Sequence, residues 1–168
     1  MVTVMEKEQQ LQQLQQLRWM REIGDLDFRR LVRSLYESGV SQSEIARRLS
    51  VSQQSVGAMI KRNEDVEYPR EGFSSASPME VCQRYAAGVI SQDQLVDELG
   101  RWEYARGSKN LRGDAPVDIV ISEPGTVDEV VRASHMGLLD REAYGAVYER
   151  LKKRADAHQG DGKPLQAD

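Results

Sequence analysis

The stretch Ser41–Arg62, SQSEIARRLSVSQQSVGAMIKR, decides the fold of the first part of this chain. Ile45 and Leu49 lie one helical turn apart, and so do Val56 and Ile60. Because residues four apart share one face of a helix, each half of the stretch has a single apolar stripe. The pattern therefore predicts two short amphipathic helices that pack against each other.

Capping residues set the ends of these helices. Ser41 with Glu44 has the spacing of a capping box, and Ser52 is a suitable cap for the second helix. Only Leu49-Ser50-Val51 remains between the two segments. We therefore expect a sharp turn there.

This pattern resembles the helix-turn-helix signature shared by bacterial repressors, resolvases, transposases and sigma-factor-like regulators. The resemblance extends from Asp27 to Arg62, and Ala46 fills the place where the two helices cross closely. Ser50 stands where the family usually has glycine, so the turn has to accept a left-handed serine at a small cost or differ slightly. The apolar positions that match the signature are Ile45, Ala46, Leu49, Val51, Val56 and Met59.

The polar residues of the second helix suit DNA. Glutamine can bond adenine through two hydrogen bonds, alanine can contact the thymine methyl group, and helix starts and basic helix ends suit phosphates. No carboxylate lies between Val51 and Arg62, although a packed hairpin without DNA remains the alternative. The candidate base-reading residues are Gln53, Gln54, Ala58 and Lys61, and the candidate phosphate contacts are Ser41, Gln42, Ser52 and Arg62.

Charge is distributed unevenly along a chain whose net charge is −4. Residues 27–62 hold seven basic and three acidic residues, a net of +4, whereas residues 63–168 hold 13 basic and 20 acidic ones, a net of −7. Because DNA affinity depends on local phosphate neutralisation, the basic segment favours DNA. The acidic remainder suits a basic protein partner, or serves solubility alone.

The N-terminal arm, residues 1–26, is rich in glutamine and leucine and lacks sustained heptads. We expect an extra helix that packs on the DNA unit, with dimerisation through the arm as the alternative; its first ten residues could also be flexible. Gly24-Asp25-Leu26-Asp27 is expected to end this helix. An amphipathic stripe then indicates the first helix of a three-helix DNA-binding domain over residues 27–62; the stripe consists of Phe28, Leu31, Val32, Leu35 and Tyr36.

Residues 63–77 form a linker or an ordered crossing loop, followed by a helical interaction domain over 78–156 and a flexible tail over 157–168. Within the interaction domain, a pattern of a helix, a glycine, a capping residue and a second helix occurs twice, at an offset of 49 residues. Glu80-Val81 in the first copy corresponds to Glu129-Val130 in the second. Both copies predict a helical hairpin. A short strand could lie at Val117–Ile121. The fold class is therefore all-α, with at most this one strand.

Several classes of function fit poorly. Cys82 is the only cysteine and His135 and His158 are the only histidines, so no Cys/His zinc set can form, and no phosphate-binding glycine motif is present. We expect no metal, no cofactor and no enzyme activity. Asp93, Asp97 and Glu98 are expected to be solvated. The lone cysteine and the lack of an apolar run of ~20 residues favour a reducing cytoplasm and no membrane. The helix-turn-helix resemblance implies that this is the bacterial cytoplasm, close to the nucleoid.

The leading hypothesis is a sequence-specific transcriptional regulator, either a repressor or an autoregulating antitoxin. Its acidic C-terminal half would bind a basic, toxin-like partner or another subunit. A homodimer is expected, because lone helix-turn-helix units usually need a second copy for affinity. Two alternatives remain: a non-catalytic protein-binding adaptor, and a DNA-targeting accessory of a recombination or transposition system.

Overall fold

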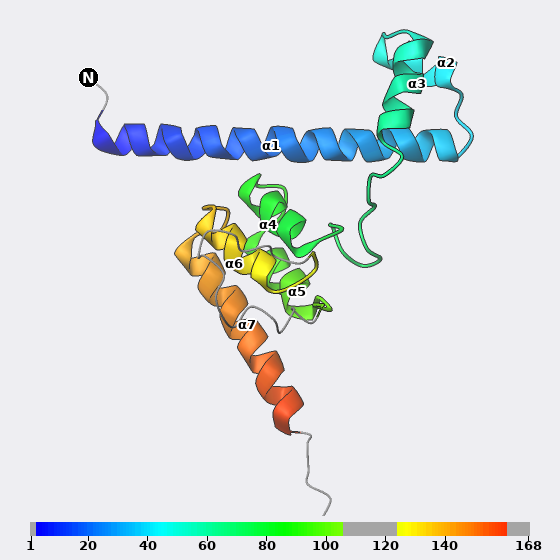
Figure 1. Cartoon of the computed structure of the whole chain (residues 1–168). Helices are drawn as coiled ribbons and strands as arrows, with labels where there is room; N and C mark the ends of the chain where they lie inside the picture. The colour runs from blue at the N-terminus through cyan, green and yellow to red at the C-terminus, as the bar shows by residue number, and fades with distance from the viewer. Residues whose placement is uncertain (1–2, 106–123, 161–168) are drawn as a thin grey trace, which may run out of the picture. The chain divides into compact units, whose positions relative to one another are not determined.

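A computed structural model of the chain describes residues 3–105 and 124–160, and all regular structure in these ranges is helical (Figure 1). The expected all-α class is therefore confirmed for the described residues, while the expected strand at 117–121 lies outside them. The helices are α1 (Val4–Glu37), α2 (Gln42–Leu49), α3 (Gln53–Arg62), α4 (Pro78–Ala86), α5 (Gln92–Arg101), α6 (Asp128–His135) and α7 (Arg141–Gly160). None of them is both long and apolar enough to cross a membrane.

The chain divides into two compact units, Met1–Gly72 and Phe73–Asp168. The first holds α1 to α3 and the second holds α4 to α7. The boundary falls within the expected linker, residues 63–77. The expected tail is partly helical, because α7 continues to Gly160, and residues 161–168 lie outside the described part.

Helix α1 is continuous, so the predicted break at residues 24–27 is wrong (Figure 1). A glycine inside a helix costs only about 1 kcal/mol relative to alanine, which a strong helix tolerates. Arg29 pairs with Asp25 at 3.1 Å one turn away, which supports the helix across this point. Consequently the N-terminal arm is not a separate helix that folds back on the DNA unit. Its start is also fixed, because Thr3 and Glu6 form a complete capping box.

The core of the first unit is small. Ile45, Ala46 and Val56 are buried together, with Val40, Leu49 and Ile60 partly buried against them. Ala46 thus lies at the crossing of α2 and α3, as expected, whereas Val51 is 38% exposed. From α1, Val32 is buried, but the rest of the predicted stripe is not. The exposed members are Phe28, Leu31, Leu35 and Tyr36.

The segment after α3 is tied to α1. The Arg33 guanidinium donates to the carbonyl oxygens of Asn63 and Val66, both at 3.3 Å, and to that of Glu64. Arg30 Nε donates to Glu67 O at 2.6 Å. Residues 63–67 are therefore an ordered crossing loop, which was the alternative to a free linker.

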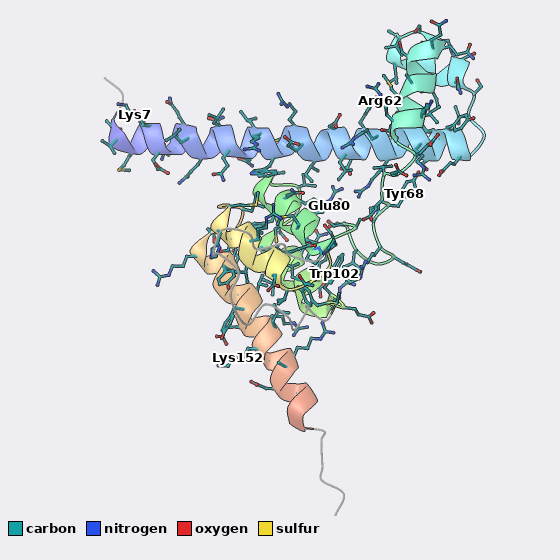
Figure 2. All side chains as sticks on the ribbon, viewed as in Figure 1. Lys7, Arg62, Tyr68, Glu80, Trp102 and Lys152 are labelled. Carbon is teal, nitrogen blue, oxygen red and sulfur yellow. The ribbon has the colours of Figure 1, made fainter. Side chains whose placement is uncertain are left out.

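Tyr68 extends this crossing loop along α1 (Figure 2). Its hydroxyl donates to Glu37 Oε2 at 3.0 Å, and the Arg33 guanidinium lies 5.4 Å from the centre of its ring. Hydrogen bonds from Arg33 and Tyr68 lower the pKa of Glu37. The ion pair is consequently present above the ordinary glutamate pKa and is lost as the pH falls through the lowered one.

The turn between α2 and α3 places Ser50 in the left-handed conformation, with φ 55° and ψ 41°. Its neighbour Val51 donates to Ala46 O at 3.1 Å, which closes the end of α2. Glycines occupy the equivalent left-handed positions after α1, α4 and α6. The serine thus adopts the turn that the helix-turn-helix resemblance implies.

We expect Ser50→Gly to raise the free energy of unfolding of the first unit by about 1 kcal/mol. The reason is that glycine takes a positive φ without the steric cost that a Cβ atom imposes. Urea denaturation followed by circular dichroism measures the change. Ser34→Gly, in the interior of α1, is the control and should lower stability, because no positive φ is relieved there. If Ser50→Gly instead lowers the free energy of unfolding, the left-handed conformation of Ser50 does not cost the folded state stability.

The second unit consists of two helical hairpins, α4–α5 and α6–α7, which pack with α4 against α6 and α5 against α7. The offset of 49 residues predicted from the sequence recurs in the hydrogen bonds. Val89 N donates to Arg84 O at 2.9 Å, and Leu138 N donates to Ala133 O at 3.0 Å. The turn that ends the first helix is therefore the same in both copies, and Val40 N makes the same bond to Leu35 O after α1, so this turn is not specific to the repeat.

One expected cap differs. Thr126 and Glu129 have the spacing of a capping box in the sequence, but α6 begins at Asp128 with Val127 in the capping position and no side-chain cap. Instead the Glu129 carboxylate accepts from Gly125 N at 2.7 Å and from Met79 N at 2.8 Å. Glu129 thereby links the two hairpins.

Glu98 is not solvated as expected. It is 2% exposed and accepts hydrogen bonds from Ser74 N, Ser74 Oγ and Gln94 Nε2 at 2.8–3.1 Å. Asp93 and Asp97 are exposed, as expected. The difference arises because Glu98 lies on the same buried face of α5 as Leu95, where Ser74 and Gln94 donate hydrogen bonds to its carboxylate.

Candidate nucleic-acid interface

The start of α3 is fixed by a side-chain cap. Ser52 Oγ accepts from Ser55 N at 3.1 Å and hydrogen-bonds with Ser55 Oγ at 2.8 Å. Helix α3 then buries Val56, which holds the opposite face toward solvent. That cap agrees with the sequence prediction.

The candidate base-reading residues share the exposed side of α3. Gln54, Ala58 and Lys61 are exposed and spaced four and three residues apart, so they lie on one face. Gln53 is exposed beside them. No acidic residue occurs in α3. The structure thus brings Gln54, Ala58 and Lys61 together on a face with no carboxylate of its own helix, whereas Gln53 lies about 100° round the helix from Gln54, toward α2.

The two glutamines differ in what they can do. Gln53 Oε1 accepts from Ser43 Oγ at 3.2 Å, which ties the start of α3 to α2. Bidentate recognition of adenine needs the oxygen and the nitrogen of one amide together. Gln54 is therefore the better candidate for base reading, and Gln53 has a positioning role. Sequence reasoning missed Ser43, whose place in the first turn of α2 was the available signal.

The candidate phosphate contacts lie at helix ends. Ser41 caps α2 and accepts from Glu44 N at 3.2 Å, and Ser52 caps α3. Gln42 is half-buried beside Gly57, where an added Cβ would lie 3.4 Å from Gln42 Oε1. The missing side chain of Gly57 thus leaves room for Gln42, so that α2 and α3 can pack closely at this point. Because helix N-termini carry partial positive charge, these serines stand where phosphate is favoured.

Arg62 lies in the last turn of α3 (Figure 2). It is exposed, and its Nε donates to Ala58 O at 3.3 Å. Together with Met59 it lines a shallow hollow against Asp25 and Arg29 of α1. Of the phosphate candidates, Arg62 is therefore the one that lines this hollow against α1.

The basic charge available to DNA is smaller than the sequence count. Arg30 and Arg33 hold the crossing loop, so they belong to the structure of the unit rather than to its α3 face. On α2, Arg47 and Arg48 both bond the Glu44 carboxylate, each through Nε at 3.1 Å, and these bonds lower the pKa of Glu44. Both arginine side chains remain more than two-thirds exposed, and they adjoin the α2–α3 turn.

Comparison of the chain with protein-family models, with curated proteins and with solved structures finds no match.

The second unit carries a separate apolar groove of about 370 Å³ between α6 and α7. Val127, Val131 and Tyr148 line it and are 38–55% exposed. Among the described residues, no cluster of three or more His, Cys, Asp or Glu side chains could hold a metal ion. His135 is exposed at the end of α6, as the sequence indicated.

Proposed function

We propose that the chain is a sequence-specific DNA-binding transcriptional regulator whose α3 enters the major groove. The observation that carries this proposal is the exposed face of Gln54, Ala58 and Lys61, displayed by a helix that is capped at Ser52 and packed at Val56. A rigid helix with amide, methyl and ammonium groups on one face matches the chemistry of base edges and phosphates.

The neighbouring groups support the same orientation. Ser41 and Ser52 mark two helix starts, and exposed Arg47 and Arg48 lie on α2. Positioning contacts to the phosphate backbone come from such groups, whereas sequence is read by the helix in the groove. In this proposal Ser41, Gln42, Ser52 and Arg62 contact phosphates, and Gln53 supports Gln54.

The second unit would then carry the regulatory partner. Residues 73–168 hold 12 basic and 16 acidic residues, a net charge of −4 that favours a basic partner, and the apolar groove between α6 and α7 offers a surface for it. A repressor and an autoregulating antitoxin both fit this division of labour. The protein would act without catalysis, at the nucleoid in the bacterial cytoplasm.

Salt-dependent binding to DNA tests the proposal. We expect the full chain to bind a fluorescent duplex of random sequence at ~50 mM salt and to lose affinity roughly tenfold or more by ~200 mM, because counterions are released from phosphates. Fluorescence anisotropy measures both affinities. If the chain does not bind duplex at ~50 mM salt, the proposal that it is a DNA-binding regulator is wrong. The exposed apolar grooves would then favour the alternative, an adaptor that binds other proteins.

A further inference from the structure

Helix α1 exposes a line of large apolar side chains that its own unit does not cover. Six of them are 37–65% exposed: Leu14, Leu17, Met20, Phe28, Leu31 and Leu35. At 3.6 residues per turn, all six lie within about 60° of one line along the helix surface. We call these six residues, with Gly24 between them, the α1 seam. Exposed contiguous apolar surface of this kind marks an interaction site.

The α1 seam is nearly symmetric about Gly24. Met20 and Phe28 lie four residues to either side of it, and Leu17 and Leu31 lie seven. Leu14 and Leu35 follow at ten and eleven. A two-fold axis at Gly24 would therefore place each large side chain of one helix opposite one of an antiparallel copy. Gly24 has open space around it, with nothing within 4 Å of an added Cβ, so two helices can cross closely there.

The C-terminal half of the α1 seam forms one wall of an open apolar groove of about 470 Å³. Phe28, Leu31 and Leu35 line it from α1, and Ile45 and Leu49 line it from α2. The matching leucines of the N-terminal half cannot fill the groove of their own chain, because α1 is one continuous helix. The same leucines of an antiparallel second copy would reach it.

We propose that two copies of this chain form a homodimer by antiparallel packing of their α1 seams about Gly24. The charged residues beside the seam agree with this direction. Arg21 and Asp25 lie on the same edge of the seam, and in an antiparallel pair equal edges face each other. Arg21 of each copy therefore faces Asp25 of the other, a complementary arrangement that favours the register.

The antiparallel direction also decides where the DNA-binding helices lie. Helix α3 packs on the edge of α1 that carries Asp25 and Arg29. Because equal edges lie on the same side of an antiparallel pair, both α2–α3 units lie on one face of the dimer. At 1.5 Å per residue they are roughly 25 Å apart along the pair, of the same order as the ~34 Å between half-sites on DNA. The pairing itself does not depend on DNA binding.

Light scattering on the full chain without DNA tests the pairing. The wild type is expected to have twice the chain mass of 19.0 kDa at micromolar concentration, and Leu31→Glu is expected to be a monomer with unchanged circular dichroism. A buried, unpaired carboxylate in the seam should weaken dimerisation at least roughly 100-fold. Leu17→Glu repeats the test far from α2 and α3. Met5→Glu, on the same helix but off the seam, is the control and should remain a dimer; Met5 is 75% exposed.

Oxidative crosslinking tests the direction. Gly24→Cys lies at the two-fold axis and should form a disulfide-linked dimer, whereas Leu17→Cys should not, because the two copies of that residue lie roughly 20 Å apart in the antiparallel register. The native Cys82 does not interfere, since burial raises the pKa of its thiol to about 12. A monomeric wild type, a dimeric Leu31→Glu, a crosslinked Leu17→Cys or an uncrosslinked Gly24→Cys would each overturn the proposed dimer.

Discussion

Replacing Glu80 by alanine is expected to lower the free energy of unfolding of the second unit by about 3–5 kcal/mol. Glu80 and Arg84 form a salt bridge in which both side chains are only 6% exposed, with Oε1 2.9 Å from Nη2 and 3.1 Å from Nε. The other carboxylate oxygen accepts from Ala76 N at 2.9 Å. Removing the Glu80 carboxylate takes a counterion away from the buried Arg84 guanidinium, which is costly.

A matched pair on the surface gives the control. Asp97 and Arg101 have the same i, i+4 spacing and a 2.8 Å contact, but their side chains are 58% and 42% exposed. Asp97→Ala should therefore change stability by less than about 1 kcal/mol. Urea denaturation of the full chain followed by circular dichroism compares the variants. Replacing both Glu80 and Arg84 by methionine should recover most of the loss, since no charge is then buried. Equal effects of Glu80→Ala and Asp97→Ala would show that burial is not what makes the pair important.

Local chemistry predicted the helix starts. Ser41 and Ser52 each accept from the backbone N–H three residues on, as the sequence indicated, and Ser77 and Ser91 make the same bond at the starts of α4 and α5. In a complete capping box, the side chain three residues after the serine bonds back to the backbone N–H of the serine. After Ser41, Ser77 and Ser91 that side chain instead bonds a residue further along its own helix. Glu44 bonds Arg47 and Arg48, Glu80 bonds Arg84, and Gln94 bonds Glu98. A serine cap bonds a backbone N–H within the same helical turn, so the local sequence is enough to predict it. A long side chain can reach partners in more than one turn, so its bond is harder to predict.

Three features of the fold were left open or wrongly predicted from the sequence. The crossing loop depends on Arg33, whose targets lie about 30 residues away and are backbone carbonyls with no sequence signature. The break at Gly24 was wrong because one glycine is a small cost beside a 34-residue helix. Glu98 was misplaced because its burial depends on Ser74 from outside α5. For the crossing loop and for Glu98, the deciding contact lay outside the window that periodicity covers.

The candidate interface was predicted better than the unit that carries it. Exposure of Gln54, Ala58 and Lys61 follows from the same period that buries Val56, so a helical wheel suffices to place them. Which glutamine is free to read a base does not follow, because Ser43 lies ten residues before Gln53 and on another helix. Similarly, the sequence gives the local net charge of +4 over residues 27–62. It does not show that some of these arginines are bound by backbone carbonyls or by Glu44.

Reversing the charge of Lys61 and Arg62 together, to glutamate, is expected to lower the affinity for a random duplex by roughly 100-fold or more at ~50 mM salt. Both side chains are exposed in the last turn of α3, and neither contributes to the buried core. Each lost phosphate contact should also reduce the slope of log affinity against log salt by about one, so loss of the Arg62 contact should lower the slope by at least about one. Fluorescence anisotropy over a salt series measures both quantities.

The control is the same charge change elsewhere. Lys152→Glu with Lys153→Glu alters the net charge of the chain equally, on an exposed part of α7 in the second unit (Figure 2). This variant should bind random duplex nearly as the wild type does, because affinity depends on charge close to the phosphates. Gln54→Ala should also keep its affinity for random duplex, since glutamine reads bases and neutralises no phosphate. Equal loss in the α3 and α7 charge variants would place the DNA contacts away from α3 and would contradict its role as the reading helix.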